Sequence, residues 1–415
     1  MLNESNVNGY AKVFPAILQS AEGEIITDIF GKKYIDFFSG AGALNYGHNH
    51  PKMKKAIHAF LNSNLVVHCL DMDSNIKKQF LEKFETIVLK PRGLNYKVQF
   101  TGPTGTNAVE AAIKLARLVT KRKKVIAFTN SFHGMSATSL ALSGSREENH
   151  KVNPSQDVIF FPFESFFNEG FSSMEYLKKM ILSKGSGVEL PAAIILETIQ
   201  AEGGINIASN EWLQQLRVFT KKHNILLIVD DIQIGCGRTG SFFSFERAQI
   251  VPDIVLLSKS ISGFGLPLSL LLMNPEFDIW KPGEHNGTFR SHNLSLCTAT
   301  VALDFWKNSR LENKISQNGK KIREKLNSLL ENSKHVVDIR GLGMIWGIEF
   351  NSEYMAENIS KSLFEKGMFI ERCGNHGQVI KLLSPLTISQ ENLEAALNLI
   401  NDTILNFQFD EVVSI

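Results

Sequence analysis

Apolar residues along this chain follow two alternating patterns, short continuous runs and longer stretches with helical spacing. Continuous apolarity in a strand-sized run indicates burial on both faces, which is typical of a mostly parallel sheet covered by helices. The predicted strands are residues 98–100, 125–128, 158–161, 193–196, 225–229 and 254–257, and 268–273 could add a further strand in the antiparallel direction. The residues that repeat at helical spacing are Val109, Ala112, Ile113, Ala116 and Val119, and then Leu213, Leu216 and Phe219. The region from about 50 to 290 therefore predicts one large α/β domain.

The pattern changes after Asn293, where the sequence predicts a smaller α+β domain. A long helical segment runs to about Asn332, and a last helix starts at Glu391. Between them we expect strands near 336–340, 344–350 and 379–383, and a helix near 355–366. The N-terminal stretch from 23 to 38 cannot form a core by itself, so we expect it to join the C-terminal domain. The expected division is 1–49 for the N-terminal segment of the small domain, 50–293 for the large domain and 294–415 for the rest of the small domain.

Composition excludes several classes of protein. A chain of 415 residues is too long for one small core, so two domains are the natural expectation. The net charge of +2 does not favour a nucleic-acid or membrane-surface partner, and no apolar run approaches the roughly 20 residues that span a bilayer. The four cysteines lie far apart without a CxxC pair, and the start of the chain lacks the blocks of a signal peptide. We therefore expect a cytoplasmic protein without a metal site.

Unusual residues follow five of the predicted strands. In open α/β sheets, ligands bind beyond the carboxyl ends of the strands, so these residues should gather at one edge of the sheet. They are the loop from Thr101 to Asn107, Phe132-His133-Gly134, Glu197, Asp230 and Lys259. Five such features together are stronger evidence for a ligand site than any one of them alone.

Each of these features also has a plainer explanation when it is taken alone. The Gly-containing loop before a helix suits a phosphate, but a turn with a helix cap has the same pattern. A carboxylate such as Asp230 or Asp231 at the end of a buried strand needs a partner, which could be a helix cap, an ion pair or a protonated ring nitrogen. Lysine is rarely buried, and burial would make Lys259 a usable amine nucleophile, although a lysine at a strand end is usually solvated.

The order of these parts resembles the class III, or ω-amino acid, aminotransferases, which use pyridoxal 5'-phosphate. The match covers about 12 to 400 and rests on four motifs. They are Asp230-Asp231-Ile232-Gln233-Ile234-Gly235-Cys236-Gly237-Arg238-Thr239-Gly240, Ser258-Lys259-Ser260, Phe132-His133-Gly134 and Gly287-Thr288-Phe289. The resemblance implies fold type I, with a mostly parallel seven-stranded sheet in a large domain and a small α+β domain formed by both termini.

The resemblance also implies roles around the ring of the cofactor. Lys259 would form the Schiff base and carry the proton, and Asp230 would pair with the pyridine nitrogen. Ile232 would pack on one ring face and Phe132 would stack on the other. Gln233 would contact the phenolic oxygen.

At the phosphate, the resemblance implies Gly105 and Thr106 from one chain and Thr288 from the neighbouring subunit, and therefore a homodimer or a higher homo-oligomer. His133 would lie near the cofactor as a packed histidine and not as a catalytic base, because the lysine already has that role.

Within the class, long stretches resemble the subfamily that makes L-2,4-diaminobutyrate and 2-oxoglutarate from L-glutamate and L-aspartate 4-semialdehyde. The stretches are 41–49, 90–96, 100–110 and 281–290. In many class III enzymes a glutamate and an arginine handle the substrate carboxylate; here these positions fall on Glu202 and Lys381. Ala201, in place of glycine, and Ser291-His292, in place of Gly-Asn, are further departures from the family pattern. Lysine cannot make the planar two-point grip of arginine.

Other functions stay open on this sequence. A different ω-aminotransferase could act on ornithine, 4-aminobutyrate or a secondary-metabolite amine with the same residues, and a non-enzymatic cofactor-binding regulator is the alternative from another class. A dinucleotide site is disfavoured, because the glycines from Gly341 to Gly347 precede a strand-like and not a helical pattern and so predict a β-turn. The pair His48 and His50 predicts the entry to a helix.

Overall fold

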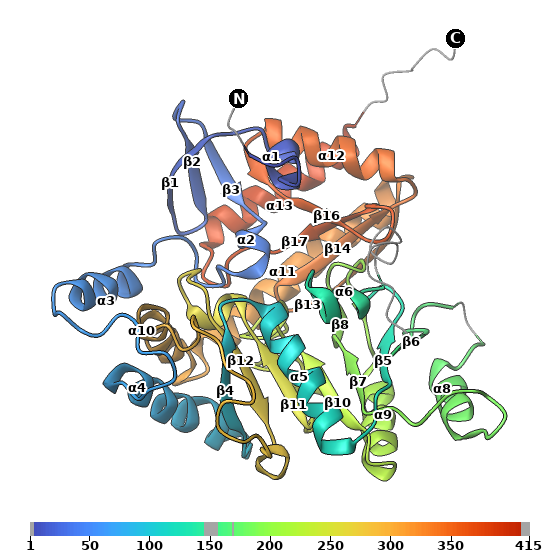
Figure 1. Ribbon diagram of the computed structural model, residues 1–415. Coiled ribbons are helices and arrows are strands. Elements are labelled where there is room, and N and C mark those ends of the chain that lie inside the picture. Colours follow the sequence, from blue (N-terminus) through green and yellow to red (C-terminus); the bar gives the residue numbers. More distant parts are fainter. Residues whose placement is uncertain (1–3, 145–156, 168–169, 408–415) are drawn as a thin grey trace.

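The computed structural model describes residues 4–144, 157–167 and 170–407 of the chain. The outermost parts of both expected terminal segments, residues 1–3 and 408–415, lie outside the described residues. In Figure 1 the seven-stranded sheet fills the lower half of the molecule, and the N-terminal strands lie above it beside the C-terminal elements. No helix in the described parts of the chain has the length and apolarity needed to cross a bilayer.

The large sheet confirms the predicted fold type. Its order is β4-β12-β11-β10-β7-β5-β6. The strands are β4 (Lys97–Gly102), β5 (Val125–Phe128), β6 (Val158–Phe161), β7 (Ala193–Leu196), β10 (Leu226–Asp230), β11 (Ile254–Leu257) and β12 (Ser269–Met273). Neighbours from β11 to β6 run parallel, whereas β12 is antiparallel to both β11 and β4, as the sequence suggested for 268–273.

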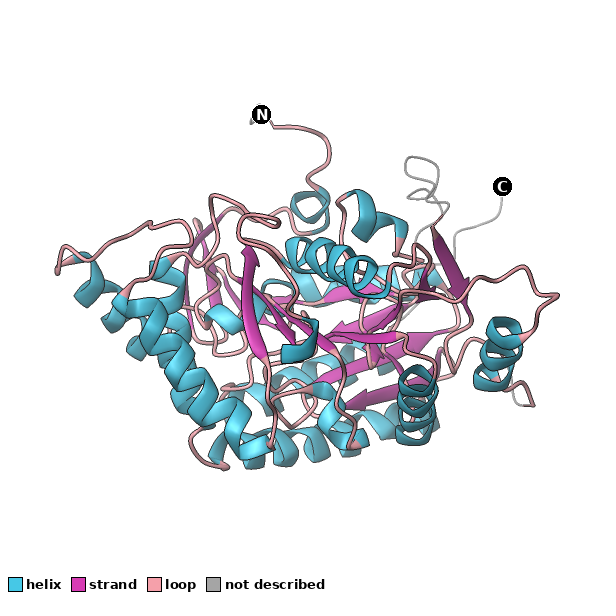
Figure 2. Ribbon diagram, turned by 60° about the horizontal axis from the view of Figure 1, so that its bottom comes forward, coloured by secondary structure: helices cyan, strands magenta, loops and turns pink. Residues whose placement is uncertain are grey.

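Burial on both faces explains the continuous apolar runs. Alternate residues of each strand belong to different clusters of buried side chains: Ile228 packs with α5 (Gly105–Thr120), whereas its neighbour Val229 packs with Trp212 of α9 (Asn210–Lys222). Figure 2 shows helices on the sides of the central strands. Other helices of this region are α3 (Pro51–Leu61), α4 (Asn75–Phe84), α6 (Ala137–Ala141) and α8 (Ser173–Leu182). The central strands β5, β7, β10, β11 and β12 are therefore buried from both sides, whereas the edge strands β4 and β6 are partly exposed.

The C-terminal part is a second sheet with its own helices. The sheet has the order β13-β14-β17-β16, from β13 (Val336–Leu342), β14 (Ile345–Phe350), β17 (Val379–Leu382) and β16 (Glu371–Cys373). Its helices are α10 (Asn293–Ala302), α11 (Arg310–Asn332), α12 (Glu353–Glu365) and α13 (Gln390–Leu405). The expected single helical segment from 293 to 332 is wrong, because a 3₁₀ turn over Leu303–Trp306 and the residues after it separate α10 from α11.

The N-terminal strands form a third sheet with a strand from the C-terminal part. The order is β1-β2-β3-β15, from β1 (Leu18–Glu22), β2 (Ile25–Asp28), β3 (Lys33–Asp36) and β15 (Met368–Phe369). Short elements complete the fold: α1 (Gly9–Val13), α2 (Ser39–Gly42) and the pair β8 (Ile199–Gln200) and β9 (Asn206–Ile207). The expected boundaries of the large and the small domain stay a prediction.

Two predicted turns are confirmed. Residues 341–347 lie on the antiparallel pair β13 and β14, which Gly343 joins at a φ of +59°. A Cβ on Gly343 would also stand 2.4 Å from the carbonyl oxygen of Arg238, so only glycine fits. His50 caps the start of α3, where its Nδ1 accepts a hydrogen bond from the backbone of Lys52. The described residues hold no group of three or more His, Cys, Asp or Glu arranged to bind a metal.

Candidate active site

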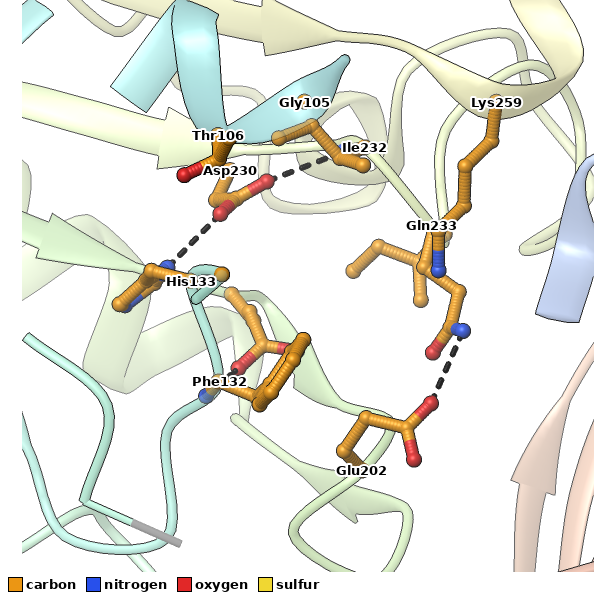
Figure 3. A pocket seen from close by; sticks show the side chains of 12 residues that line it. Gly105, Thr106, Phe132, His133, Glu202, Asp230, Ile232, Gln233 and Lys259 are labelled. Carbon is orange, nitrogen blue, oxygen red and sulfur yellow. Dashed lines mark hydrogen bonds and ion pairs between the residues drawn. The ribbon is translucent and has the colours of Figure 1, made fainter. Parts of the chain in front are cut away.

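A cavity opens at the carboxyl ends of the parallel strands, where the sequence placed its unusual residues. It encloses about 570 Å³ of empty space, including the part that is open to solvent. Twelve residues from separate strand ends line it: Gly105, Thr106, Phe132, His133, Gly134, Glu197, Glu202, Asp230, Ile232, Gln233, Ile234 and Lys259. Figure 3 shows the side chain of Lys259 pointing into this space. Nine of the eleven residues predicted for the site are thus brought together, all except Thr288 and Lys381.

Lys259 begins a short 3₁₀ turn directly after β11. Its φ of +50° lies in the left-handed region, which costs energy for a lysine and which the surrounding structure must enforce. Among the described residues its Nζ has no hydrogen-bond partner, and burial lowers the pKa of this amine. A lysine with a lowered pKa and a free lone pair is suited to nucleophilic attack on a carbonyl carbon.

Asp230 is the last residue of β10 and faces the cavity, while Asp231 does not. The Oδ2 atom of Asp230 accepts a hydrogen bond of 2.7 Å from Nδ1 of His133, and its Oδ1 accepts one from the backbone of Ile232 at 3.1 Å. Asp231 instead accepts from the backbone N–H and the hydroxyl of Ser244. Because a carboxylate has about four acceptor positions, Asp230 keeps capacity for one more donor. The structure thus separates the two adjacent carboxylates that the sequence could not tell apart.

His133 is buried and holds Asp230 in place. Donation from its Nδ1 to Asp230 leaves Nε2 as an acceptor, and Nε2 has no hydrogen-bond partner among the described residues. The ring of His133 therefore supports the carboxylate of Asp230, and its expected role as a packed histidine stays a prediction.

Glu197 follows β7 and was not among the predicted site residues, although it was noted as a polar residue at a strand end. Its two oxygens accept the backbone N–H groups of Phe132 at 2.9 Å and of Ala201 at 3.2 Å. Burial raises the pKa of this carboxyl to about 7. Glu197 therefore fixes the loop that carries Phe132 and the loop that carries Glu202.

The start of α5 supplies a polar cradle. Gly105 lies so close to Ile232 that a Cβ there would be 2.9 Å from its Cδ1 atom. The hydroxyl of Thr106 is 2.6 Å from both Ser136 Oγ and Ser139 Oγ. Neither serine was predicted, because isolated serines in a loop carry no distinctive spacing. Hydroxyls together with the backbone at a helix N-terminus favour a bound phosphate.

These observations fit pyridoxal 5'-phosphate, which the resemblance implies. The helix start offers donors for the phosphate, and Asp230 has acceptor capacity for the ring nitrogen. Ile232 and Phe132 supply apolar groups to the cavity, and Lys259 offers an unpaired amine.

The expected contact of Gln233 with the cofactor is constrained by its present hydrogen bonds. Both amide hydrogens of Gln233 are engaged, with Ala41 O at 2.9 Å and Glu202 Oε1 at 3.0 Å. Contact between Gln233 and the phenolic oxygen would require one of these bonds to open.

Glu202 and Lys381 form an ion pair at the edge of the cavity. Lys381 lies on β17 and is fully buried, and its Nζ is 2.5 Å from Glu202 Oε1. A second carboxylate, Glu371 Oε2 on β16, is 3.0 Å from the same Nζ. The hydroxyl of Tyr10 in α1 donates to the other oxygen of Glu371 at 2.9 Å. Glu371 and Tyr10 were not predicted.

The charges of this cluster are strongly coupled. Burial opposes ionisation of Glu202, yet Lys381 outweighs it and lowers the pKa of Glu202 to about 2. Burial raises the pKa of Glu371, and the carboxylate of Glu202 adds to the rise. Burial alone would lower the pKa of Lys381, but the two carboxylates raise it overall. The cluster is therefore a lysine that stays charged between two unequal carboxylates.

Thr288 lies apart from the cavity of its own chain. It is exposed, and its backbone oxygen is 2.8 Å from Nε2 of His68. A contribution of this residue to a neighbouring subunit stays a prediction.

Comparison with known proteins gives concordant matches. The aminotransferase class-III family matches residues 7–404. An uncharacterized aminotransferase of Sinorhizobium fredii is 48% identical over 97% of this chain and 90% of its own length. A diaminobutyrate–2-oxoglutarate transaminase of Halalkalibacterium halodurans is 48% identical over 97% of this chain and 94% of its own. The crystal structure of a transaminase from the marine bacterium Virgibacillus has the same fold, with a TM-score of 0.85 over 94% of this chain and 92% of that one at 23% identity.

Proposed function

Because the chain belongs to the class III aminotransferases, which use pyridoxal 5'-phosphate, we propose that it transfers an amino group from L-glutamate to L-aspartate 4-semialdehyde. The products are 2-oxoglutarate and L-2,4-diaminobutyrate, and the reaction is reversible. The observation that carries this choice of substrates is the buried cluster of Lys381, Glu202 and Glu371 beside the cavity. A pocket with both signs of charge suits substrates whose far ends differ in charge. Relatives named diaminobutyrate–2-oxoglutarate transaminases, 46–48% identical over nearly the whole chain, support the same choice.

The cavity residues have complementary tasks in this reaction. Gly105 and Thr106 would hold the phosphate of the cofactor, and Asp230 would hold the ring nitrogen in its protonated form. Ile232 and Phe132 would enclose the ring faces. When bound, pyridoxal phosphate accepts the amino group of one substrate for transfer to the next and stabilises the electron pair left on the substrate carbon.

Lys259 would supply the movable base. Burial lowers the pKa of its amine, so that Nζ can be neutral and can take a proton from the substrate carbon. The buried carboxylate of Asp230, fixed by His133 at 2.7 Å, would lie beside the ring nitrogen. An electrostatic group that is already oriented needs no rearrangement as charge develops, which is why such groups lower barriers.

The two substrates place different groups at the far end of the cavity. Glutamate presents a carboxylate there, which needs a cation. Diaminobutyrate, reacting through its 4-amine, presents an ammonium and a carboxylate. Lys381 would pair with the carboxylate, and Glu202 would pair with the ammonium. One cavity could therefore accept both substrates in turn.

Substrate profiling with the purified holoenzyme tests the proposal. Each amine is mixed with the enzyme separately, and the loss of cofactor absorbance gives kcat/KM for the first half-reaction. We expect glutamate and L-2,4-diaminobutyrate to exceed ornithine and 4-aminobutyrate by about tenfold or more. If ornithine or 4-aminobutyrate reacts faster than diaminobutyrate, the enzyme is another ω-aminotransferase.

A further inference from the structure

Lys381 is held by two carboxylates, although one would neutralise it. Glu202 and Glu371 come from different parts of the fold, and both are within 3.0 Å of the lysine Nζ. Glu371 lies directly opposite Lys381 on the neighbouring antiparallel strand, so the sheet register itself brings the two side chains together. A buried charge is costly unless it is matched, and this cluster has one carboxylate more than its lysine requires.

The two carboxylates are not equivalent in position. Glu202 lines the cavity, whereas Glu371 lies behind it and does not. Tyr10 fixes Glu371 with a hydrogen bond of 2.9 Å to Oε1. Glu202 receives Gln233 and Lys381 on Oε1 only, and no hydrogen bond from the described residues reaches its Oε2. Glu371 is therefore the anchored carboxylate, and Glu202 is the one with an oxygen still available in the cavity.

We propose that Glu371, anchored by Tyr10, shares the charge of Lys381 with Glu202, and that this leaves the unpaired Oε2 of Glu202 available to bind the distal ammonium group of a diamino substrate. The inference rests on the proposed function, in which diaminobutyrate is such a substrate. Glu371 acts through Lys381 and Glu202, so it is a positioning residue that sets specificity.

The charge count gives the physical reason. One lysine and two carboxylates give the cluster a net charge of −1, and Glu202 is its member that faces the cavity. A substrate ammonium matches that charge, whereas a substrate with only a carboxylate at its far end does not. Without Glu371, the charge of Glu202 would be needed to balance Lys381, and the cluster would present no net negative charge to the cavity.

The same cluster accommodates glutamate. When a substrate carboxylate approaches Lys381, a third negative charge enters the cluster. The incoming carboxylate then competes with Glu202 for Lys381, while Tyr10 keeps Glu371 in place with its hydrogen bond of 2.9 Å. The groups that face it are Tyr10, Lys381 and Glu202, and Tyr10 stays neutral because burial and Glu371 raise its pKa.

The test compares two amines that differ by one ammonium group. L-2,4-Diaminobutyrate and 4-aminobutyrate share the reacting 4-amine and the carboxylate, and only the first carries the 2-ammonium. Glu371→Gln should lower the ratio of kcat/KM for diaminobutyrate over 4-aminobutyrate by about tenfold or more, because Glu202 must then serve Lys381. A purely structural role would lower both values alike and leave the ratio unchanged, which would overturn the inference.

Three further variants sharpen the test. Tyr10→Phe keeps the ring that packs at 5.1 Å from Phe38 and removes only the hydroxyl, so it should shift the ratio in the same direction by a smaller factor. Glu175→Gln is the matched control: it removes an exposed carboxylate on α8 that pairs with Lys178, and the ratio should not change. In a Glu202→Gln background, Glu371→Gln should have little further effect, because the group through which it acts is gone.

The outcomes separate this inference from the proposed function. A wild-type enzyme that does not use diaminobutyrate refutes both. A wild-type enzyme that uses diaminobutyrate, with the same ratio in Glu371→Gln and Tyr10→Phe, refutes the role of Glu371 alone. If Glu371→Gln does not fold, Tyr10→Phe decides, since it leaves both carboxylates in place.

Discussion

Replacement of Lys381 by methionine tests the charge cluster most directly. Methionine has nearly the same length, so Lys381→Met removes the charge without leaving a large cavity. The lysine is fully buried and lies 2.5 Å from Glu202 and 3.0 Å from Glu371. Loss of one partner from a buried ion pair costs about 3–5 kcal/mol of stability, because the charges left behind are uncompensated. We therefore expect a lower unfolding temperature, which a second substitution, Glu202→Gln, should partly restore.

The kinetic consequence should depend on the substrate. The carboxylate of glutamate loses its cation, and a loss of about 2 kcal/mol in binding corresponds to a rise of about thirtyfold in KM. Diaminobutyrate keeps the interaction of its ammonium with Glu202, so its KM should change less. Single-turnover half-reactions with each amine, followed through cofactor absorbance, measure the two effects separately. Equal losses for both amines, or none for either, would show that Lys381 is structural and that the carboxylate binds elsewhere.

Four further predictions concern the cofactor, the buried acids and the assembly. Lys259→Ala should abolish turnover while weak non-covalent cofactor binding remains, and borohydride reduction of the wild type followed by peptide mapping should find the cofactor on Lys259 and on no other lysine. Asp230→Asn should keep the cofactor bound but slow proton abstraction at least about a hundredfold, as measured by single turnover; a near-normal rate would assign the task to another group. Burial raises the pKa of Asp231 from 3.8 to about 7, so the folded protein holds a proton that the unfolded chain has released, and stability falls as the pH rises through this window. Asp231→Asn should therefore gain in unfolding temperature relative to the wild type between pH 5 and 8, and a constant difference would refute this reasoning. Thr288→Ala subunits mixed with Lys259→Ala subunits should regain activity if Thr288 serves the neighbouring site, whereas mixing that gives no gain would place Thr288 outside it.

Much of the fold followed from local pattern alone. Strands buried on both faces are continuously apolar, so β5, β6, β7 and β11 have the predicted bounds. The helical segment after Asn293 was less predictable, because the residues at Leu303–Trp306 remain apolar through the 3₁₀ turn that interrupts it. Strands of two or three residues, such as β15 and β16, have too few positions to show any period. Such strands are defined by the partner that they pair with, which the local sequence does not contain.

The candidate site also has residues that the sequence pattern predicts and residues that it does not. Asp230 and Lys259 stand directly after apolar strands, so their position at one sheet edge follows from the pattern. The sequence could not say whether Asp230 or Asp231 faces the cavity, because this depends on Ser244 being within reach of Asp231. Glu371 gave no signal, since a glutamate on a three-residue strand resembles any solvated residue. Only the register that sets it opposite Lys381 reveals that its charge is buried.

The cluster explains why both ends of the chain belong to one site. Tyr10 comes from the N-terminal segment, Glu202 from the loop of β8 and β9, and Glu371 and Lys381 from the C-terminal sheet. Tyr10 and Glu371, which are hydrogen-bonded, are 361 positions apart in the sequence. The residues that would hold the cofactor within the cavity, by contrast, lie between Gly105 and Lys259, at the ends of the strands of the large sheet. If the cluster selects the substrate as proposed, the two substitutions in it should move the preference in opposite directions. Lys381→Met should disfavour glutamate and Glu371→Gln should disfavour diaminobutyrate, while neither should alter the residues that would hold the cofactor.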